Sequence, residues 1–100
     1  MNNSRVCVVI PTYNNASTLA SVVKGVAQYT PNIIVVNDGC TDGTDKLLAE
    51  SFPHIDVVTH NRNRGKGAAL LSAFKKAQQM GYTPVSYNHL RAHETKANLV

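Results

Sequence analysis

Short apolar runs alternate with longer amphipathic stretches along the first 83 residues, and this alternation limits the chain to few folds. An apolar, β-branched run predicts a strand that is buried on both faces, as the strands of parallel sheets are. A stretch whose apolar positions recur at helical spacing predicts a helix with one buried side. The expected strands are residues 6–10, 33–36 and 55–59, and the expected helices are about 17–29, 44–51 and 66–80.

The ends and buried sides of the helices follow from the same pattern. Ser17 has the side chain of a helix N-cap, and either Thr41 or Asp42 can cap the second helix. Gly81 follows the third helix in the C′ position, where glycine is preferred. The expected buried side of the third helix consists of Leu70, Ala73, Phe74, Ala77 and Met80.

Three strand–helix units in a row determine the fold class. Because crossovers between parallel strands are almost always right-handed, the units predict an α/β fold, a Rossmann-like open parallel sheet with helices on both faces. A fourth strand should begin near Tyr82. Sheets of this kind bind ligands beyond the carboxyl ends of their strands. The loops expected at that edge are polar and rich in Asn, Asp and Gly, and they comprise residues 11–16, 37–43 and 60–65.

Residues 84–100 do not continue the pattern, since they show neither strand alternation nor a helical stripe. The segment Val85 to Thr95 resembles the translation of a common sequencing-library transposase adapter, from which it differs at Asn88. We therefore expect a native fold over residues 1–83 and a non-native or disordered tail over residues 84–100. Without a fourth strand, the first strand would be an open apolar edge, which predicts marginal stability and self-association.

Charge and cysteine content exclude several classes of function. The formal net charge of +4 is scattered along the chain, so no nucleic-acid partner is predicted. There is no apolar run of about 18 residues or more and no recognisable signal peptide, so no transmembrane segment is expected. Cys7 lies in an apolar run and Cys40 in a polar turn, which is neither a disulfide framework nor a metal-ligand pattern. We expect reduced thiols and a cytoplasmic protein.

The first loop, Pro11-Thr12-Tyr13-Asn14, puts an aromatic side chain at the ligand edge, where it could pack on a base or a ribose. A simpler interpretation is a strand end followed by a helix start. A dinucleotide-binding unit would have Gly-x-Gly-x-x-Gly at this turn, and a P-loop has its own Gly-rich motif ending in Lys-Ser or Lys-Thr. Neither motif occurs, which disfavours nicotinamide and flavin enzymes and P-loop nucleotide hydrolysis.

The second loop contains two Asp-Gly turns, Asp38-Gly39 and Asp42-Gly43. Asp42 is sufficiently explained as a residue that starts the following helix. Asp38 stands at the carboxyl end of a strand, which favours a role as acceptor for a ligand donor such as the imide N–H of a pyrimidine. A charge-assisted hydrogen bond of this kind contributes about 1.5 to 3 kcal/mol, enough to select one base over another.

The third loop places three cations, Arg62, Arg64 and Lys66, at the approach to a helix. The free N–H groups and the positive dipole end of a helix N-terminus, together with Lys66, would suit a diphosphate or a base carbonyl. A solvated basic loop capped by Asn63 explains the same residues. Their spacing does not decide between the two interpretations.

With all three loops described, residues 5–83 resemble the N-terminal half of a family 2 glycosyltransferase with the GT-A fold. The segment Val-Val-Ile-Pro-Thr-Tyr-Asn that begins at Val8 resembles the opening strand and loop of that family. Residues 34–44 resemble its Val-Asp-Asp-Gly-Ser-Thr-Asp-Gly-Thr element, with Asn37 and Cys40 in place of the usual Asp and Ser. The segment Asn-Arg-Gly-Lys-Gly-Ala-Ala-Leu resembles its third nucleotide-binding segment.

Within the family, the chain is most similar to the bacterial branch related to polyprenyl-phosphate sugar transferases such as dolichol-phosphate mannose synthase. The resemblance implies transfer of a sugar from a nucleotide-diphospho-sugar, UDP- or GDP-linked, to an acceptor such as a polyprenyl phosphate. Residues 1–83 would be the nucleotide-sugar-binding half, in the cytoplasm and able to work at the inner face of the membrane. The residues that the resemblance assigns to the nucleotide-sugar site are Pro11, Thr12, Tyr13, Asn14, Asp38, Gly39, Gly65, Lys66 and Gly67.

The metal ligands of the family are missing from this chain. Family members place an Asp-x-Asp on the fourth strand, where its carboxylates hold Mg²⁺ or Mn²⁺ against the donor diphosphate. No Asp or Glu lies between Asp56 and Glu94. The resemblance therefore implies that the metal ligands, the acceptor site and any catalytic base lie downstream, and that this chain by itself is inactive.

Two other functions remain open at this point. A nucleotidyltransferase shares the α/β layout and a basic nucleotide loop, but it would have a Gly-rich loop bearing Arg or Lys after the first strand. A non-catalytic module that only binds a nucleotide or a partner subunit would need no downstream catalytic motif.

Overall fold

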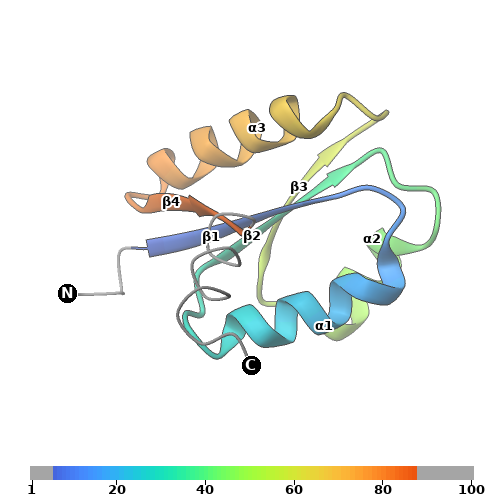
Figure 1. The fold of residues 1–100 in the computed structure, drawn as a ribbon, viewed down its shortest axis with the longest axis horizontal. Coiled ribbons are helices and arrows are strands. Elements are labelled where there is room, and N and C mark those ends of the chain that lie inside the picture. Colours follow the sequence, from blue (N-terminus) through green and yellow to red (C-terminus); the bar gives the residue numbers. More distant parts are fainter. Residues whose placement is uncertain (1–5, 88–100) are drawn as a thin grey trace, which may run out of the picture.

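A computed structural model of the protein describes residues 6–87, which form a four-stranded parallel sheet in the order β3-β2-β1-β4 (Figure 1). The elements are β1 (Val6–Thr12), α1 (Ala16–Ala27), β2 (Ile33–Asp38), α2 (Thr44–Ser51), β3 (Asp56–His60), α3 (Lys66–Gln79) and β4 (Thr83–Ser86). Each of the first three strands and of the three helices begins and ends within two residues of its predicted bounds, and the α/β fold is confirmed. None of the helices in the described part of the chain is long and apolar enough to cross a membrane.

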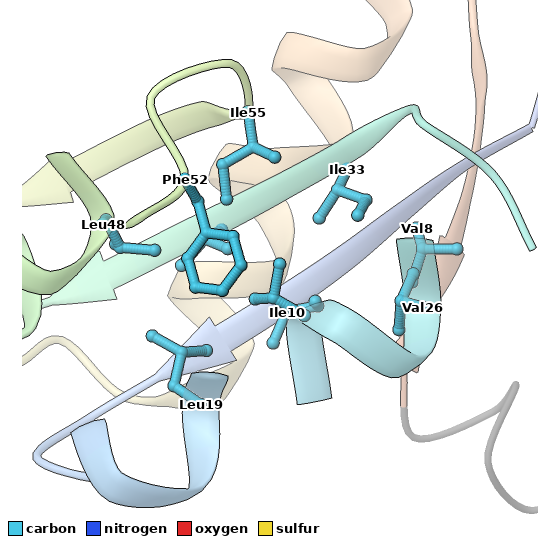
Figure 2. Close-up of a cluster of buried hydrophobic side chains, with 10 residues drawn as sticks. Val8, Ile10, Leu19, Val26, Ile33, Leu48, Phe52 and Ile55 are labelled. Atoms are coloured by element: carbon cyan, nitrogen blue, oxygen red, sulfur yellow. The ribbon is translucent and has the colours of Figure 1, made fainter. Parts of the chain in front are cut away.

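The inner strands are apolar along most of their length because both faces of the sheet are covered, by α1 and α2 on one side and by α3 on the other (Figure 1). Successive side chains of a strand point to opposite faces, so Val8 and Ile10 pack with α1 whereas Cys7 and Val9 pack with α3. Figure 2 shows the first of the two clusters. Its buried members are Val8, Ile10, Leu19, Val23, Val26, Ile33, Val35, Leu48, Phe52 and Ile55.

The buried side of α3 consists of small residues, which lets the helix lie close to the sheet. These residues are Ala69, Ala73 and Ala77. Leu70 and Phe74, which the sequence places on the same side, are only partly buried. The prediction for Met80 was wrong: its side chain is 40% exposed, because α3 has ended and Met80 is the C-cap.

Gly81 ends α3 and turns the chain toward β4. Its φ is +83°, in the left-handed region that favours glycine. The N–H of Gly81 donates to the carbonyl of Gln78 (3.1 Å), and the N–H of Tyr82 donates to the carbonyl of Ala77 (2.9 Å). This pair of bonds is a Schellman motif, so the predicted C′ role of Gly81 is confirmed.

The fourth strand begins at Thr83, close to its expected start near Tyr82, but it includes residues 84–86, which the sequence pattern places in the tail. β4 pairs in parallel with the first residues of β1, so the fold continues past residue 83 and β1 lies inside the sheet. The expectation of an open β1 edge was wrong, and the argument for self-association falls with it. A short edge strand needs no alternating pattern, and an edge position tolerates Pro84, which has no N–H to donate. The rest of the expected tail, residues 88–100, lies outside the described residues.

The two cysteines are free thiols. Cys7 is fully buried in the cluster under α3. Burial raises the pKa of the Cys7 thiol to about 11, and the charge of Asp56 adds to this effect. Cys7 is therefore a protonated, apolar component of the core.

Candidate functional site

A pocket of about 320 Å³ lies at the carboxyl ends of β1 and β2, the edge at which the sequence predicts a ligand. Its lining residues are Pro11, Thr12, Tyr13, Asp38, Asn63, Lys66 and Tyr87. Five of them belong to the predicted site. The other predicted residues are chain neighbours of lining residues, and they are Asn14, Gly39, Gly65 and Gly67.

Both oxygens of the Asp38 carboxylate are hydrogen-bonded, and only 4% of this side chain is exposed. Oδ1 lies 2.8 Å from Nδ1 of His60 and accepts from the backbone N–H of Arg64 (3.0 Å). Oδ2 accepts from Nδ2 of Asn63 (3.1 Å) and from the backbone N–H of Gly65 (3.0 Å). Three of these donors are consecutive residues of the third loop, so Asp38 fixes that loop against the end of β2.

The pKa of Asp38 lies below its ordinary value of 3.8. Burial acts to raise the pKa, because a buried carboxylate loses its hydration. The hydrogen bonds from the Arg64 N–H, from His60 and from the Gly65 N–H outweigh burial, and the charge interaction with His60 adds to them. The carboxylate is therefore ionised at neutral pH although it is buried.

The hydrogen bonds of Asp38 bear on its predicted role as an acceptor for a base. An ionised carboxylate has about four lone-pair sites, and the donors described above fill that capacity. A ligand N–H would have to displace one of them. Direct binding of a base by Asp38 stays a prediction, whereas its hold on the third loop is a feature of the structure.

Gly39 is needed because the second and third loops approach each other closely. Its φ is +76°, and a Cβ at this position would clash with backbone atoms of Arg62 and Asn63. Glycine therefore has two independent reasons to occupy this position. The predicted site residue Gly39 supports the pocket by allowing the loops to pack.

The first loop is held to the second by Asn14, which has a φ of 49°. Oδ1 of Asn14 accepts from the N–H of Thr41 (2.7 Å), and the N–H of Asn14 donates to Sγ of Cys40 (3.3 Å). The Cys40 thiol in turn donates to the carbonyl of Thr12 (3.4 Å). Cys40 thus acts as both acceptor and donor, the two roles that the usual Ser could also perform.

Asp42 lies between the N-termini of α1 and α2. Its Oδ1 accepts from the N–H (3.2 Å) and the hydroxyl (2.5 Å) of Thr44, the first residue of α2. Its Oδ2 accepts from the N–H of Ala16, the first residue of α1 (3.0 Å). The Thr44 hydroxyl and the Ala16 N–H hold the pKa of Asp42 below its ordinary value. Asp42 therefore contacts the start of α2, but neither Thr41 nor Asp42 is the predicted cap, because the N-cap residue is Gly43.

The start of α1 differs from the prediction. The N-cap residue is Asn15 and not Ser17, and no side chain of the cap position bonds to the helix. The first N–H of α1 is instead satisfied by Asp42, which is 26 residues away in the chain. A sequence pattern of local caps has no access to such a contact.

Lys66 opens α3 and lines the pocket. The N–H groups in the first turn of a helix have no acceptor within the helix, and they favour anions. Between residues 6 and 87, no ion pair involves Arg62, Arg64 or Lys66. The interpretation of Asn63 as a helix cap was wrong, because its amide donates to the carboxylate and the carbonyl of Asp38.

The described residues do not fit a magnesium or manganese ion. Within residues 6–87, no three His, Cys, Asp or Glu side chains are grouped so that they could hold a metal. The oxygens of Asp38 and Asp42 already accept hydrogen bonds from N–H and O–H groups. Neither carboxylate is free to act as a metal ligand without breaking contacts between the loops.

Sequence reasoning missed two residues of the site and misassigned Asn63. His60 follows a β-branched strand, and the sequence predicts it only as the start of a polar loop, yet its ring is buried and contacts both Asp38 and Ser72. Tyr87 lies in the expected tail, yet it lines the pocket. A buried histidine at a strand end next to a carboxylate could have been suspected from the sheet register, in which His60 pairs with Asp38.

Comparison with curated proteins shows similarity to several sugar transferases. The chain is 35% identical over 78 residues to the glycosyltransferase AglJ of Haloferax volcanii, covering 77% of this chain and 25% of that protein. It is 35% identical over 85 residues to a polyprenol monophosphomannose synthase of Mycolicibacterium smegmatis, covering 79% of this chain and 32% of that protein. It is 27% identical over 97 residues to a UDP-N-acetylglucosamine--dolichyl-phosphate N-acetylglucosaminyltransferase of Methanococcus voltae, covering 81% and 39%.

The chain spans between 25% and 39% of the length of these three curated relatives. The family model described as glycosyl transferase family 2 matches residues 7–80, from the start of β1 to the end of α3. This match includes all three loops that surround the pocket and most of the residues that line it. The chain belongs to glycosyl transferase family 2.

Proposed function

We propose that this chain is the donor-nucleotide part of an enzyme that transfers a sugar from a nucleotide-diphospho-sugar to a polyprenyl phosphate. The observation that carries the proposal is the pocket at the carboxyl ends of β1 and β2 in a chain of this family. The names of two relatives, a polyprenol monophosphomannose synthase and a dolichyl-phosphate N-acetylglucosaminyltransferase, support a polyprenyl phosphate as the acceptor.

The chemistry of the pocket suits the nucleotide part of such a donor. Tyr13 is 53% exposed, so its ring is available to pack on a base or a ribose. Lys66 and the first turn of α3 offer positive charge and N–H groups to a diphosphate. The cavity of about 320 Å³ is small for a ligand pocket, since such pockets span roughly 300 to 1,000 Å³. This size supports binding of the nucleoside part.

The remaining parts of the reaction are assigned to regions that this chain does not span. Mg²⁺ or Mn²⁺, when bound, would neutralise the departing diphosphate as a Lewis acid. Its ligands would be carboxylates outside residues 6–87, because the described carboxylates do not fit. A lipid phosphate acceptor is already anionic and needs little help from a general base. We expect no turnover by the chain alone, and a cytoplasmic location that allows work at the inner face of the membrane.

Isothermal titration of the folded chain with UDP, GDP and ADP, each with Mn²⁺, tests the pocket. We expect UDP or GDP to bind more tightly than ADP. Lys66→Ala should weaken that binding on the order of tenfold, because a charge-assisted contact of about 1.5 kcal/mol is lost. Lys75→Ala is the matched control, since Lys75 is exposed in the same helix and lies outside the pocket. Failure of both UDP and GDP to bind a folded sample would overturn the proposed site.

Family membership also bears on the two alternative functions. Family 2 is a glycosyltransferase family, and no observation favours a nucleotidyltransferase, whose Gly-rich basic loop is absent after β1. A module that only binds a nucleotide differs from the proposed enzyme in one respect: it would not transfer a sugar. An assay of a longer form with a radiolabelled sugar nucleotide and a polyprenyl phosphate separates the two: transfer to lipid supports the enzyme.

A further inference from the structure

His60 is a buried, titratable side chain to which the proposed function assigns no role. It is the last residue of β3, and 7% of its side chain is exposed. Nδ1 lies 2.8 Å from Oδ1 of Asp38, and Nε2 lies 2.9 Å from Oγ of Ser72 in α3. The ring therefore connects the end of β2 to the helix that follows the third loop.

The protonation of the ring follows from its partners. An ionised carboxylate can only accept, so Nδ1 of His60 must carry a proton toward Asp38. In the neutral ring Nε2 then accepts, and the Ser72 hydroxyl donates to it; in the charged ring Nε2 donates to Oγ of Ser72. The bond to Asp38 is present in both charge states, so the contact does not depend on which one is populated.

His60 differs from the other donors to Asp38 in where it comes from. Those donors all belong to the third loop, whereas His60 belongs to a strand and pairs with Asp38 in the register of β2 and β3. The sheet therefore fixes the ring, and the ring fixes Oδ1. Because Oδ1 also accepts from the Arg64 N–H, the orientation of the carboxylate determines where the third loop lies.

We infer that His60 is a positioning residue of the pocket: it orients the Asp38 carboxylate so that Asn63 and Lys66 stand at the pocket wall. The inference rests on the proposed function for the identity of the ligand, a nucleotide. Ser72 supports the same arrangement by holding the far side of the ring. His60 touches no ligand in this arrangement and acts only through Asp38.

Two substitutions separate the two contacts of the ring. In Asn the side-chain amide is as far from Cβ as Nδ1 of His is, so His60→Asn can keep a donor to Asp38 and lose the contact with Ser72. In Gln the amide matches Nε2, so His60→Gln can keep the contact with Ser72 and lose the donor to Asp38. The readout is hydrogen exchange of the Arg64 and Gly65 amides, measured by NMR against the Val35 amide in the core of β2.

His60→Gln should speed the exchange of Arg64 and Gly65 on the order of tenfold relative to Val35, as expected for loss of a charge-assisted bond. His60→Asn should change it by less than about threefold. A residue with a merely structural role would speed all amides together in both variants. Equal behaviour of the two variants, or unchanged exchange in His60→Gln, would overturn the inference.

The ring spectrum of the wild-type chain gives a test that needs no variant. Its ¹⁵N signals should show the Nδ1–H form for neutral His60, with the exposed His54 as the internal comparison. A neutral His60 protonated at Nε2 would refute the inference even if both variants fail to fold.

UDP or GDP titration separates this inference from the proposed function. If the two variants show the expected amide exchange but the chain binds neither UDP nor GDP, the proposed nucleotide ligand is refuted and His60 remains the residue that positions the third loop. If His60→Gln binds UDP or GDP about tenfold more weakly than the wild-type chain, both the proposed function and the inference are supported.

Discussion

Asp38 and Asp42 both hold separate segments of the chain together through hydrogen bonds, but they differ in burial. Each carboxylate lies near the end of β2, accepts hydrogen bonds from distant parts of the chain and joins two loops or helices at the ligand edge. Asp38 is buried, whereas Asp42 is exposed. Water can replace a donor lost from an exposed carboxylate but not one lost from a buried carboxylate. The contact between the second and third loops should therefore be rigid, and the contact at the helix N-termini should tolerate change.

The strongest test of this difference is Asp38→Asn. The Asn side chain places an NH₂ group where an oxygen of the Asp38 carboxylate accepts hydrogen bonds. The donors that face this NH₂ group lose their acceptor, and because they are buried they stay unpaired. Each buried donor left without an acceptor costs about 1 to 3 kcal/mol, so the loss should be at least about 2 kcal/mol. Urea denaturation monitored by circular dichroism measures the loss. Asp45→Asn, an exposed position in the first turn of α2, is the matched control and should change stability little. A loss below about 1 kcal/mol for Asp38→Asn would show that the burial of this carboxylate is unimportant.

Acid should weaken the fold through the same carboxylate. Because the pKa of Asp38 is lowered in the folded chain, its ionised form contributes stability that is complete above the ordinary value of 3.8 and is lost as pH falls through the lowered pKa. Urea midpoints should therefore be steady above about pH 5 and decline below about pH 4. Titration of the Asp38 carboxyl by NMR identifies the group, and a pKa at or above 3.8 would contradict the hydrogen-bond geometry.

Substitutions at Gly39 and Gly43 separate the cost of a steric clash from the cost of backbone strain. Both have positive φ, +76° and +87°, but only at Gly39 would a Cβ meet the backbone of the third loop. Gly43→Ala should cost about 1 kcal/mol, the strain of a left-handed residue, whereas Gly39→Ala should cost at least about 2 kcal/mol. Urea midpoints of the two variants give the comparison. Equal losses would mean that the second and third loops can separate at little cost.

The sequence was informative where the relevant interactions are local. The β-branched runs and helical stripes predict the first six elements, because strand and helix periodicities are visible within a few residues. The polar loops at the strand ends predict the place of the pocket, and five of its lining residues, for a similar reason: a parallel sheet brings its carboxyl ends together.

Prediction failed where a residue's role depends on contacts across the chain. The sequence predicts the start of a fourth strand near Tyr82, but residues 84–86 have no strand pattern of their own and are expected in the tail. They pair with β1 after Gly81 has turned the chain toward it. His60 looks like any polar loop residue until the register sets it beside Asp38. The first N–H of α1 is satisfied from the second loop, so the local cap predicted at Ser17 is not needed. Each of these three failures concerns a partner more than ten residues away, whereas the wrong prediction for Met80 has a local cause, the end of α3.

The smallest expected effect is that of Asp42→Asn. The amide retains one acceptor oxygen, so either the Thr44 or the Ala16 contact can persist, and water can replace the other because the position is exposed. The urea midpoint should fall less than in Gly43→Ala, while hydrogen exchange of the Ala16 amide or the Thr44 amide becomes faster. Nucleotide binding should not change, since Asp42 does not line the pocket. If Asp42→Asn destabilises the chain as strongly as Asp38→Asn, burial is not what distinguishes the two carboxylates. The contact that Asp42 makes between the N-termini of α1 and α2 would then have to be as rigid as the contact between the second and third loops.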